Sequence, residues 1–330
     1  MPEILVLNEK ELREAVRLDM ETVDLIADAF AALSSGAVVM PPILRMDMDD
    51  RNGEVDVKTA YMPGLDGFAI KVSPGFFDNP KKGLSTTSGL MVLHDSETGF
   101  VKAVLLDNGY LTDIRTAAAG AVAARALSRE DSKSAAIIGT GMQARLQAQA
   151  LSMVRPLEAF AVWGRDADKA AACAADIARL TSVETTVSES IAGAIRGADV
   201  VVTTTPSRKP LITAEMLHPG LHITAMGSDS EHKNEIAPGA LAEADLFVCD
   251  RHQQSAHLGE LHHAVGAGAV PEDMPVVELG SIVSGNHPGR TGADQITLCD
   301  LTGTGVQDTA IATRAHAVAV ARGAGTKVTN

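Results

Sequence analysis

The fold is decided by AAIIGTGMQARLQAQALSMV, residues 135–154. Apolar residues lead into a glycine turn and then into a run without helix breakers, which predicts a strand, a tight turn and a helix. Gly139 permits the turn, Gly141 lets the backbone approach a phosphate, and Ala144 takes the third small position, where helix and strand touch. The stretch therefore predicts a pyrophosphate-binding turn at the N-terminus of a helix.

The segments after this turn alternate between strand and helix patterns. EAFAVWGRD predicts a strand, ADKAAACAADIARL a helix, and DVVVTTTPS, HITAMGS, DLFVCD and ITLCDLTG further strands. Strands that alternate with helices at this spacing predict βαβ units and a parallel sheet. We therefore expect a doubly wound, Rossmann-type α/β domain over residues 119–308. This context favours a dinucleotide site over a glycine turn without a ligand.

The first 115 residues show a different pattern. ILVL at 4–7 predicts a strand, Asn8 with Glu11 predicts a capping box, and residues 21–34 predict an amphipathic helix. Between residues 40 and 110, short alternating segments broken by Gly, Pro and Asp predict antiparallel strands. We expect a separate α+β domain here, joined to the next domain by a helix. A final helix, GVQDTAIATRAHAVAVARGAG, is expected to close the chain.

Composition narrows the class of protein. A chain of 330 residues favours two domains, and a net charge of −14 without a basic tract argues against nucleic acid and anionic membranes as partners. No apolar run approaches the length of a membrane span, and the start MPEILVLNEKELREAV lacks the features of a secretory signal. The three cysteines are scattered without metal-like spacing, which indicates free thiols, no metal and a cytoplasmic location.

The end of the second Rossmann strand bears on the choice of coenzyme. NAD enzymes usually place an acidic residue there, but this chain continues from Trp163 into Gly164 and Arg165. Arg165 could hold a 2′-phosphate or stack on adenine, whereas Asp166 could bind the ribose one position late. Both could instead form a surface turn that caps the helix from Ala167. We expect NAD(P)(H), with NADP(H) favoured.

The stretch DNGYLTDIRTAAAGAVAARALS, together with GTGMQA and MGSD…HKNE, resembles the ornithine cyclodeaminase/mu-crystallin family. The resemblance covers nearly the whole chain, with the motifs in the same order. It implies a homodimer and a split substrate-binding and dimerisation domain, 1–118 with 309–330, beside the dinucleotide domain. It also implies redox chemistry at a carbon–nitrogen bond with a nicotinamide cofactor and a small imine or amino-acid substrate.

The same resemblance implies roles for individual residues. Arg45 and Arg115 match arginines for a substrate carboxylate, Lys71 matches the active-site lysine, and Asp229 matches the catalytic aspartate. Lys58 lies nearby on an alternating strand and could face the substrate. Taken alone, Arg45 would be a surface arginine on a hairpin, Lys71 an edge residue and Asp229 the cap of a turn.

Lys233 matches a family lysine and is expected to form a structural ion pair, whereas His232 is expected to be a loop histidine. His262 and His263 suggest a metal site, but their adjacent positions and the lack of carboxylate–histidine spacing argue against it. GTGVQD, 303–308, resembles the loop that closes over the nicotinamide. The full set expected at the cofactor is Thr86, Arg115, Thr116, Gly139, Thr140, Gly141, Met142, Gln143, Arg165, Asp166, Thr204, Thr205, Met226, Gly227, Gly303 and Gly305.

Two departures from the family pattern bear on the substrate. Ornithine cyclodeaminases carry a glutamate for the far amino group of ornithine where this chain has Ala60, so ornithine is disfavoured. The loop MGSDSEHKNEI looks more like members encoded with ectoine-utilisation enzymes. We therefore expect an imine reductase in ectoine or hydroxyectoine catabolism. The alternatives are a cyclodeaminase that uses catalytic NAD+ and releases ammonia, a ketimine or iminosuccinate reductase, an amino-acid dehydrogenase, and a non-catalytic NADPH-binding protein.

Overall fold

The computed structural model describes residues 3–329, which form two compact units. Unit 1 combines Met1–Arg115 with Thr304–Asn330, and unit 2 is Thr116–Gly303. The sequence placed the joins at 118/119 and 308/309. The second join lies earlier because helix α11 already begins at Gly305, where a Cβ atom would lie 2.3 Å from the Thr59 carbonyl oxygen of unit 1.

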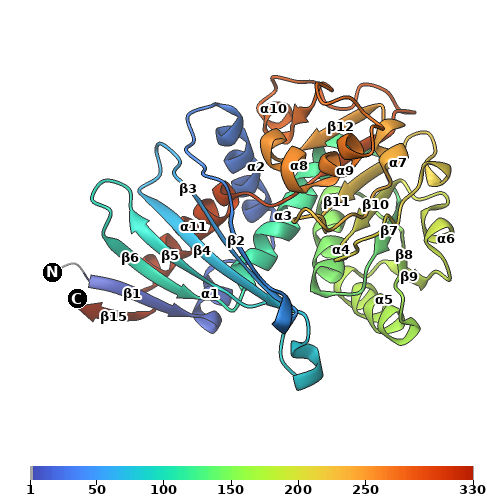
Figure 1. Ribbon diagram of the computed structural model, residues 1–330. Coiled ribbons are helices and arrows are strands. Elements are labelled where there is room, and N and C mark those ends of the chain that lie inside the picture. Colours follow the sequence, from blue (N-terminus) through green and yellow to red (C-terminus); the bar gives the residue numbers. More distant parts are fainter. Residues whose placement is uncertain (1–2, 330) are drawn as a thin grey trace. The chain divides into compact units, whose positions relative to one another are not determined.

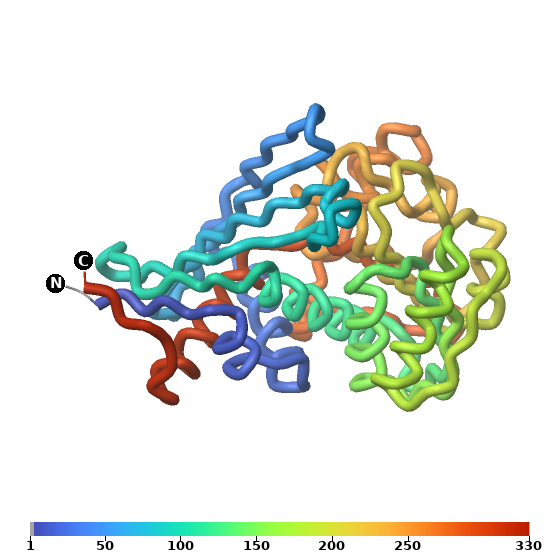
Figure 2. Tube along the Cα trace, turned by 90° about the horizontal axis from the view of Figure 1, so that it is seen from below, coloured from blue at the N-terminus to red at the C-terminus, as the bar shows by residue number. Residues whose placement is uncertain are grey.

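The sheet of unit 1 has seven strands in the order β15-β1-β6-β5-β4-β3-β2. Its strands are β1 (Glu3–Asn8), β2 (Leu44–Met48), β3 (Gly53–Ala60), β4 (Gly67–Phe76), β5 (Leu90–Asp95), β6 (Val101–Leu106) and β15 (Thr326–Thr329). All neighbours are antiparallel except β1 and β6. Strand β15 was not predicted, and Figure 2 shows it beside β1.

Three α-helices accompany this sheet: α1 (Glu9–Ala15), α2 (Met20–Ser34) and α11 (Gly305–Arg322), with short 3-10 turns at Asp49–Arg51 and Asn79–Lys82. The predicted capping box of Asn8 and Glu11 is confirmed. Helix α11 packs against β3, β4, β5 and α2 (Figure 1), with Val306 and Ala310 in a core beside Ala60. The start of α11 is therefore buried against the two strands β3 and β4.

The sheet of unit 2 is parallel throughout and has eight strands in the order β13-β12-β14-β11-β10-β7-β8-β9. Its strands are β7 (Ser134–Ile138), β8 (Ala159–Trp163), β9 (Glu184–Val187), β10 (Val200–Thr203), β11 (His222–Ala225), β12 (Leu246–Cys249), β13 (Val277–Glu278) and β14 (Thr297–Asp300). The predicted fold class, a Rossmann-type domain beside an α+β domain, is confirmed.

Helices cover both faces of this sheet because its central strands are apolar on both sides. On β7, Ala135 and Ile137 pack in one core with α4 (Met142–Val154) and α5 (Ala167–Thr181), and Ala136 and Ile138 pack in another. The second core includes α6 (Ile191–Ile195), α7 (Pro238–Ala242) and α9 (Glu260–Gly266). The remaining elements are α3 (Tyr110–Leu127), the 3-10 turn Ala214–Met216, α8 (His252–Leu258) and α10 (Leu279–Val283). None of the helices within residues 3–329 has the length and apolar character that crossing a bilayer requires.

Candidate functional site

The candidate residues fall into two groups, one in each unit. In unit 1, strand pairing sets Arg45 opposite Asp56 and Lys58 opposite Lys71. Residues paired across antiparallel strands project from the same face, as do residues two apart on one strand. These four side chains therefore leave the sheet on one face, the face of the buried positions of β3.

Lys71 is the centre of this group. It lies on the interior strand β4 and is 2% exposed, so it is not an edge residue. Its Nζ donates to Asp308 Oδ1 at 3.0 Å and lies 2.9 Å from Oδ2. Arg115 Nε lies 3.1 Å from Asp308 Oδ1, and Asp308 itself is 0% exposed. One buried carboxylate therefore contacts both of the cations that the sequence assigned to catalysis and substrate binding.

Burial governs the ionisation of Lys71. Loss of solvation, helped by Arg115 and Lys58, lowers the pKa of Lys71 from 10.5 to about 7, although Asp308 acts in the opposite direction. Burial also raises the pKa of Asp107, whose Oδ2 accepts the Leu111 N–H at the start of α3. A lysine that titrates near neutrality is suited to proton transfer.

Asp308 was not among the predicted site residues. The predicted final helix is confirmed: α11 begins at Gly305 after a capping box of Thr304 and Gln307, so only the first two residues of GTGVQD lie in a loop. Asp308 therefore sits in a helical turn that packs on β3 and β4. The sequence carried one signal that could have identified it: an acidic residue that leads directly into a run of small and apolar residues, DTAIA.

Arg45 is held by acidic side chains of its own hairpin. Its guanidinium pairs with Asp47 at 3.0 Å, with Asp56 at 3.3 Å and with Glu54. Three carboxylates therefore already hold the side chain that was expected to receive a substrate carboxylate. Lys58, by contrast, is buried beside Lys71 and interacts with it electrostatically.

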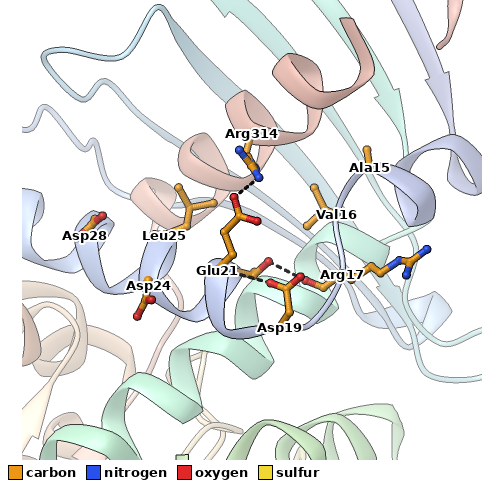
Figure 3. Close-up of a pocket in the computed structure, with 10 residues that line it drawn as sticks. Ala15, Val16, Arg17, Asp19, Glu21, Asp24, Leu25, Asp28 and Arg314 are labelled. Atoms are coloured by element: carbon orange, nitrogen blue, oxygen red, sulfur yellow. Dashed lines mark hydrogen bonds and ion pairs between the residues drawn. The ribbon is translucent and has the colours of Figure 1, made fainter. Parts of the chain in front are cut away.

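A hollow elsewhere in unit 1 has the wrong charge for a carboxylate substrate. It lies between the end of α1, the start of α2 and α11, and four of its lining residues are acidic: Asp19, Glu21, Asp24 and Asp28 (Figure 3). Arg314 enters it but pairs with Glu21. The excess of negative charge favours the Lys71 group as the substrate site of this unit.

In unit 2 the glycine turn has the geometry that a dinucleotide needs. Gly139 has φ +136°, and a Cβ atom there would lie 2.3 Å from Thr204 Oγ1. Gly141 is the N-cap of α4, and nothing lies within 4 Å of the position where its Cβ would be. Because glycine brings no capping side chain, the N–H groups of the first turn of α4 stay available to a pyrophosphate. These residues have the shape and the free N–H groups that suit a dinucleotide.

The end of β8 resolves one alternative left open by the sequence. The Asp166 carboxylate accepts the Lys169 N–H at 3.0 Å and is the N-cap of α5. Arg165 beside it is exposed, and within residues 3–329 it forms no ion pair. Asp166 Oδ1 therefore caps the helix, whereas the exposed guanidinium of Arg165 is free of ion pairs within residues 3–329.

Asp229 lies in the loop after β11, in unit 2. Its Oδ1 accepts from Lys233 Nζ at 2.7 Å, which confirms the predicted ion pair, and its side chain is 37% exposed. His232 is exposed, as expected for a loop residue. The strand before this loop ends at Ala225, one residue earlier than the sequence suggested.

Two buried carboxylates, Glu235 and Glu260, hold this loop through hydrogen bonds. Glu235 accepts from Gly227 N at 2.8 Å, from Thr203 Oγ1 at 2.6 Å, and from Thr205 through both N and Oγ1. Glu260 accepts from Ser228 Oγ, from Asn234 Nδ2 and from the N–H groups of Glu235 and Ile236. The loop is thus anchored at both ends.

A third acid, Asp300, accepts from Ser255 Oγ and from Glu260 N. Burial raises the pKa of Glu235 to about 7 and raises the pKa values of Glu260 and Asp300 as well. Within residues 3–329 the donors to these three carboxylates are N–H groups, hydroxyls and one amide.

The remaining cofactor candidates are placed as follows. Thr86 lies in the segment before β5 and not on a strand, and its carbonyl accepts the Phe76 N–H at 2.8 Å. The Thr116 carbonyl accepts from Gln147 Nε2, and Gln143 accepts from the same amide. Gly303 N donates to Asp250 Oδ2 at 2.7 Å. Four cofactor candidates remain: Thr140, Met142, Met226 and Gly305. Met142 is exposed at the start of α4, Met226 follows β11, and Gly305 begins α11.

The two adjacent histidines, His262 and His263, contact each other and the loop after β11. Their rings meet edge to face, and His263 Nε2 lies 2.8 Å from the Lys233 carbonyl oxygen. No set of three histidine, cysteine or acidic side chains within residues 3–329 is grouped to hold a metal ion.

Comparison with known proteins gives one consistent picture. The model of the ornithine cyclodeaminase/mu-crystallin family matches residues 3–322. A putative dehydrogenase of Rhizobium meliloti (strain 1021) is 58% identical over 326 residues, which cover 99% of each chain.

Solved structures agree with this match. The Δ1-pyrroline-2-carboxylate reductase of Thermococcus litoralis, in complex with NADH and L-proline, is 28% identical with a TM-score of 0.93, over 98% of this chain and all of that one (100%). The iminosuccinate reductase of Paracoccus denitrificans, in complex with NAD+, is 30% identical with a TM-score of 0.90, over 99% and 100% of the two chains.

Proposed function

Because the chain belongs to the ornithine cyclodeaminase/mu-crystallin family, we propose that it is an NAD(P)H-dependent oxidoreductase that reduces the C=N bond of a small imine derived from an amino acid. The observation that carries this proposal is Lys71, a buried lysine beside Asp308 and Arg115 whose pKa is about 7. Such a lysine can give and take a proton at neutral pH. The imine reductases among the similar structures support the same class of reaction.

The reduction adds one hydride to carbon and one proton to nitrogen, so that C=N becomes CH–NH. When bound, the reduced nicotinamide supplies the hydride. The Lys71 ammonium gives the proton from Nζ and is left as a neutral amine, which solvent protonates again. Arg115 orients the substrate by pairing with its carboxylate.

Other residues have supporting roles in this proposal. Lys58, on the same face as Lys71, attracts the anionic substrate. Asp229, already paired with Lys233, is a second acid–base or binding group. Arg45 binds substrate only if it leaves one of its three carboxylates, so its direct role in binding is smaller than that of Arg115.

The substrate that we propose first is a cyclic or open ketimine carboxylate. Ala60 is fully buried beside the start of α11, which leaves no acid there for a second ammonium group and disfavours ornithine. Δ1-Pyrroline-2-carboxylate and iminosuccinate are the reference compounds, and an imine of ectoine or hydroxyectoine breakdown remains a prediction from the loop 226–236. The proposed coenzyme is NADP(H), on the strength of the exposed Arg165.

Two further proposals concern assembly and location. The edge strand β2 exposes Leu44 and Met46, at 63% and 52%, which supports pairing with a second copy in a homodimer. A cytoplasmic location stays a prediction from the three free cysteines.

The test is loss of NADH or NADPH absorbance with each candidate imine, including pyruvate and oxaloacetate mixed with ammonia. We expect oxidation with at least one carboxylated imine and no ammonia release. Ammonia release without net coenzyme turnover would replace the proposal with a cyclodeaminase. Tight coenzyme binding without turnover on any imine would indicate a binding protein instead.

A further inference from the structure

We propose that Asp308 is a positioning residue of this site, whose carboxylate holds the Lys71 ammonium and the Arg115 guanidinium together so that proton donor and carboxylate anchor act as one unit. The inference rests on the proposed function and adds a residue to it. Asp308 does not touch the substrate in this scheme, because it acts through the two cations.

The neighbours of Asp308 cap the helix α11 and dock it on the sheet, and the Asp308 carboxylate contacts the two cations. Gln307 completes the cap of α11 by accepting from Thr304 N and Oγ1. Thr309 docks the helix on the sheet, because its Oγ1 accepts from Ala69 N at 3.0 Å and donates to the Ala60 carbonyl at 2.8 Å. Asp308, between them, contacts Lys71 and Arg115.

The charge balance around Lys71 explains why such a residue is needed. Arg115 from α3 and Lys58 from β3 both disfavour the ammonium form, and burial disfavours it further. The acidic groups that interact with Lys71 are Asp308 from α11 and Asp107 from the turn before α3. Asp308 is the one at hydrogen-bond distance. Removing its charge should therefore favour the neutral amine.

The direct test measures the ionisation of Lys71 without turnover. Protein labelled with ¹³C at lysine Cε is titrated by NMR, and Lys71 is assigned by the signal lost in Lys71→Arg. We expect a midpoint of about 7 in the natural chain. In Asp308→Asn we expect the pH midpoint of Lys71 to be lower by about one pH unit or more. In Asp308→Glu we expect a midpoint between those of the natural chain and Asp308→Asn.

A matched control separates position from folding. Thr309→Val removes the docking bonds of the adjacent residue, so it should lower the melting temperature but leave the Lys71 midpoint in place. A midpoint in Asp308→Asn equal to or above that of the natural chain would overturn the inference. If Asp308→Asn does not fold, Asp308→Glu decides: a shifted midpoint supports the inference, and an unshifted one overturns it.

The outcome is distinguishable from failure of the proposed function. If the chain oxidises no coenzyme with any imine but Asp308→Asn shifts the Lys71 midpoint, the role of Asp308 stands and the reductase function is wrong. If the chain reduces an imine but the basic limb of its kcat–pH profile does not move in Asp308→Asn, the proposed reductase function stands. The proposed role of Asp308 is then wrong.

Discussion

Unit 1 and unit 2 both bury carboxylates, but they neutralise them differently. Asp308 in unit 1 meets a lysine and an arginine, whereas Glu235, Glu260 and Asp300 in unit 2 meet N–H groups, hydroxyls and an amide. A buried carboxylate needs partners in either case, since its desolvation costs several kcal/mol.

The partners decide what the carboxylate can do. Between two cations, Asp308 influences when Lys71 releases its proton, because it acts to raise the pKa of that lysine. Among neutral donors, Glu235 has a pKa near 7 and can itself take up a proton. We infer that unit 1 uses the buried acid Asp308 for chemistry and that unit 2 uses Glu235 and Glu260 to fix the loop after β11.

The largest effect is expected from Lys71→Ala. Loss of the proton donor should lower kcat/KM by about 10²- to 10⁴-fold, with the affinity for NAD(P)H, measured by fluorescence titration, unchanged. Lys102→Ala is the matched control. Lys102 is also a lysine of this sheet, on β6, but it pairs with Asp66, the residue before β4. If Lys71→Ala kept activity within a few fold of the natural chain, Lys71 would not be the proton donor. Asp308 would then have no chemical role that sets it apart from the buried acids of unit 2.

The next effect is on the stability of unit 2. Glu260→Leu leaves the Ser228, Asn234, Glu235 and Ile236 donors without their acceptor. Unpaired buried donors cost about 1–3 kcal/mol each, so we expect urea unfolding to report a loss of about 3 kcal/mol or more. Glu260→Gln should lose less, since its amide keeps one acceptor oxygen. Equal stability of Glu260→Leu and the natural chain would show that the loops do not depend on this acid.

A smaller effect concerns the pH dependence of stability. The folded state holds the proton of Glu235 up to pH about 7, whereas the unfolded state releases it near 4.5. Because the folded state binds more protons in this window, Glu235 makes stability fall as pH rises from about 4.5 to 7, on the order of 2 kcal/mol. Glu235→Gln should flatten that fall in urea midpoints measured across the window. An unchanged slope would mean that Glu235 is ionised throughout.

The smallest effect extends the comparison to an unburied charge. Arg165 has no carboxylate to neutralise it within residues 3–329, so we expect it to pair with the 2′-phosphate of NADPH. Arg165→Ala should weaken NADPH about tenfold and leave NADH nearly unchanged. Arg179→Ala, at an arginine already paired with Asp176, serves as control. Equal weakening of both coenzymes would assign Arg165 to adenine and not to the phosphate.

Much of the fold followed from local patterns. The strand and helix patterns around Gly139 predicted β7, β8, β10, β11, β12 and β14, because parallel strands buried on both faces are continuous apolar runs. The short elements between β12 and β14 were not predicted. The capping box at Asn8 was also readable. Strand β15 was not, since TKVT is short and exposed and forms a strand only by pairing with β1.

The candidate site divides in the same way. Lys71 and Arg115 were named from the motifs around them, and the structure brings both to one carboxylate. Asp308 was missed because its partner Lys71 is far away in sequence, and no local pattern specifies such a contact. The sequence assigned Arg45 to the substrate and gave no sign of its ion pairs. Its strand pairing with Asp56 and its ion pairs with Glu54 and Asp47 become visible only in the folded hairpin.

The late arrival of α11 and β15 sets the order in which a newly made chain can become active. Residues 116–303 form a compact unit, which is translated before the second segment of unit 1. Strands β1 to β6 are made first, but α11, which packs on β3, β4 and β5, and β15, which extends their sheet, follow only after unit 2. Lys71 therefore gains its countercharge only after unit 2 has been translated, and a ribosome that stalls before residue 308 leaves Lys71 without Asp308.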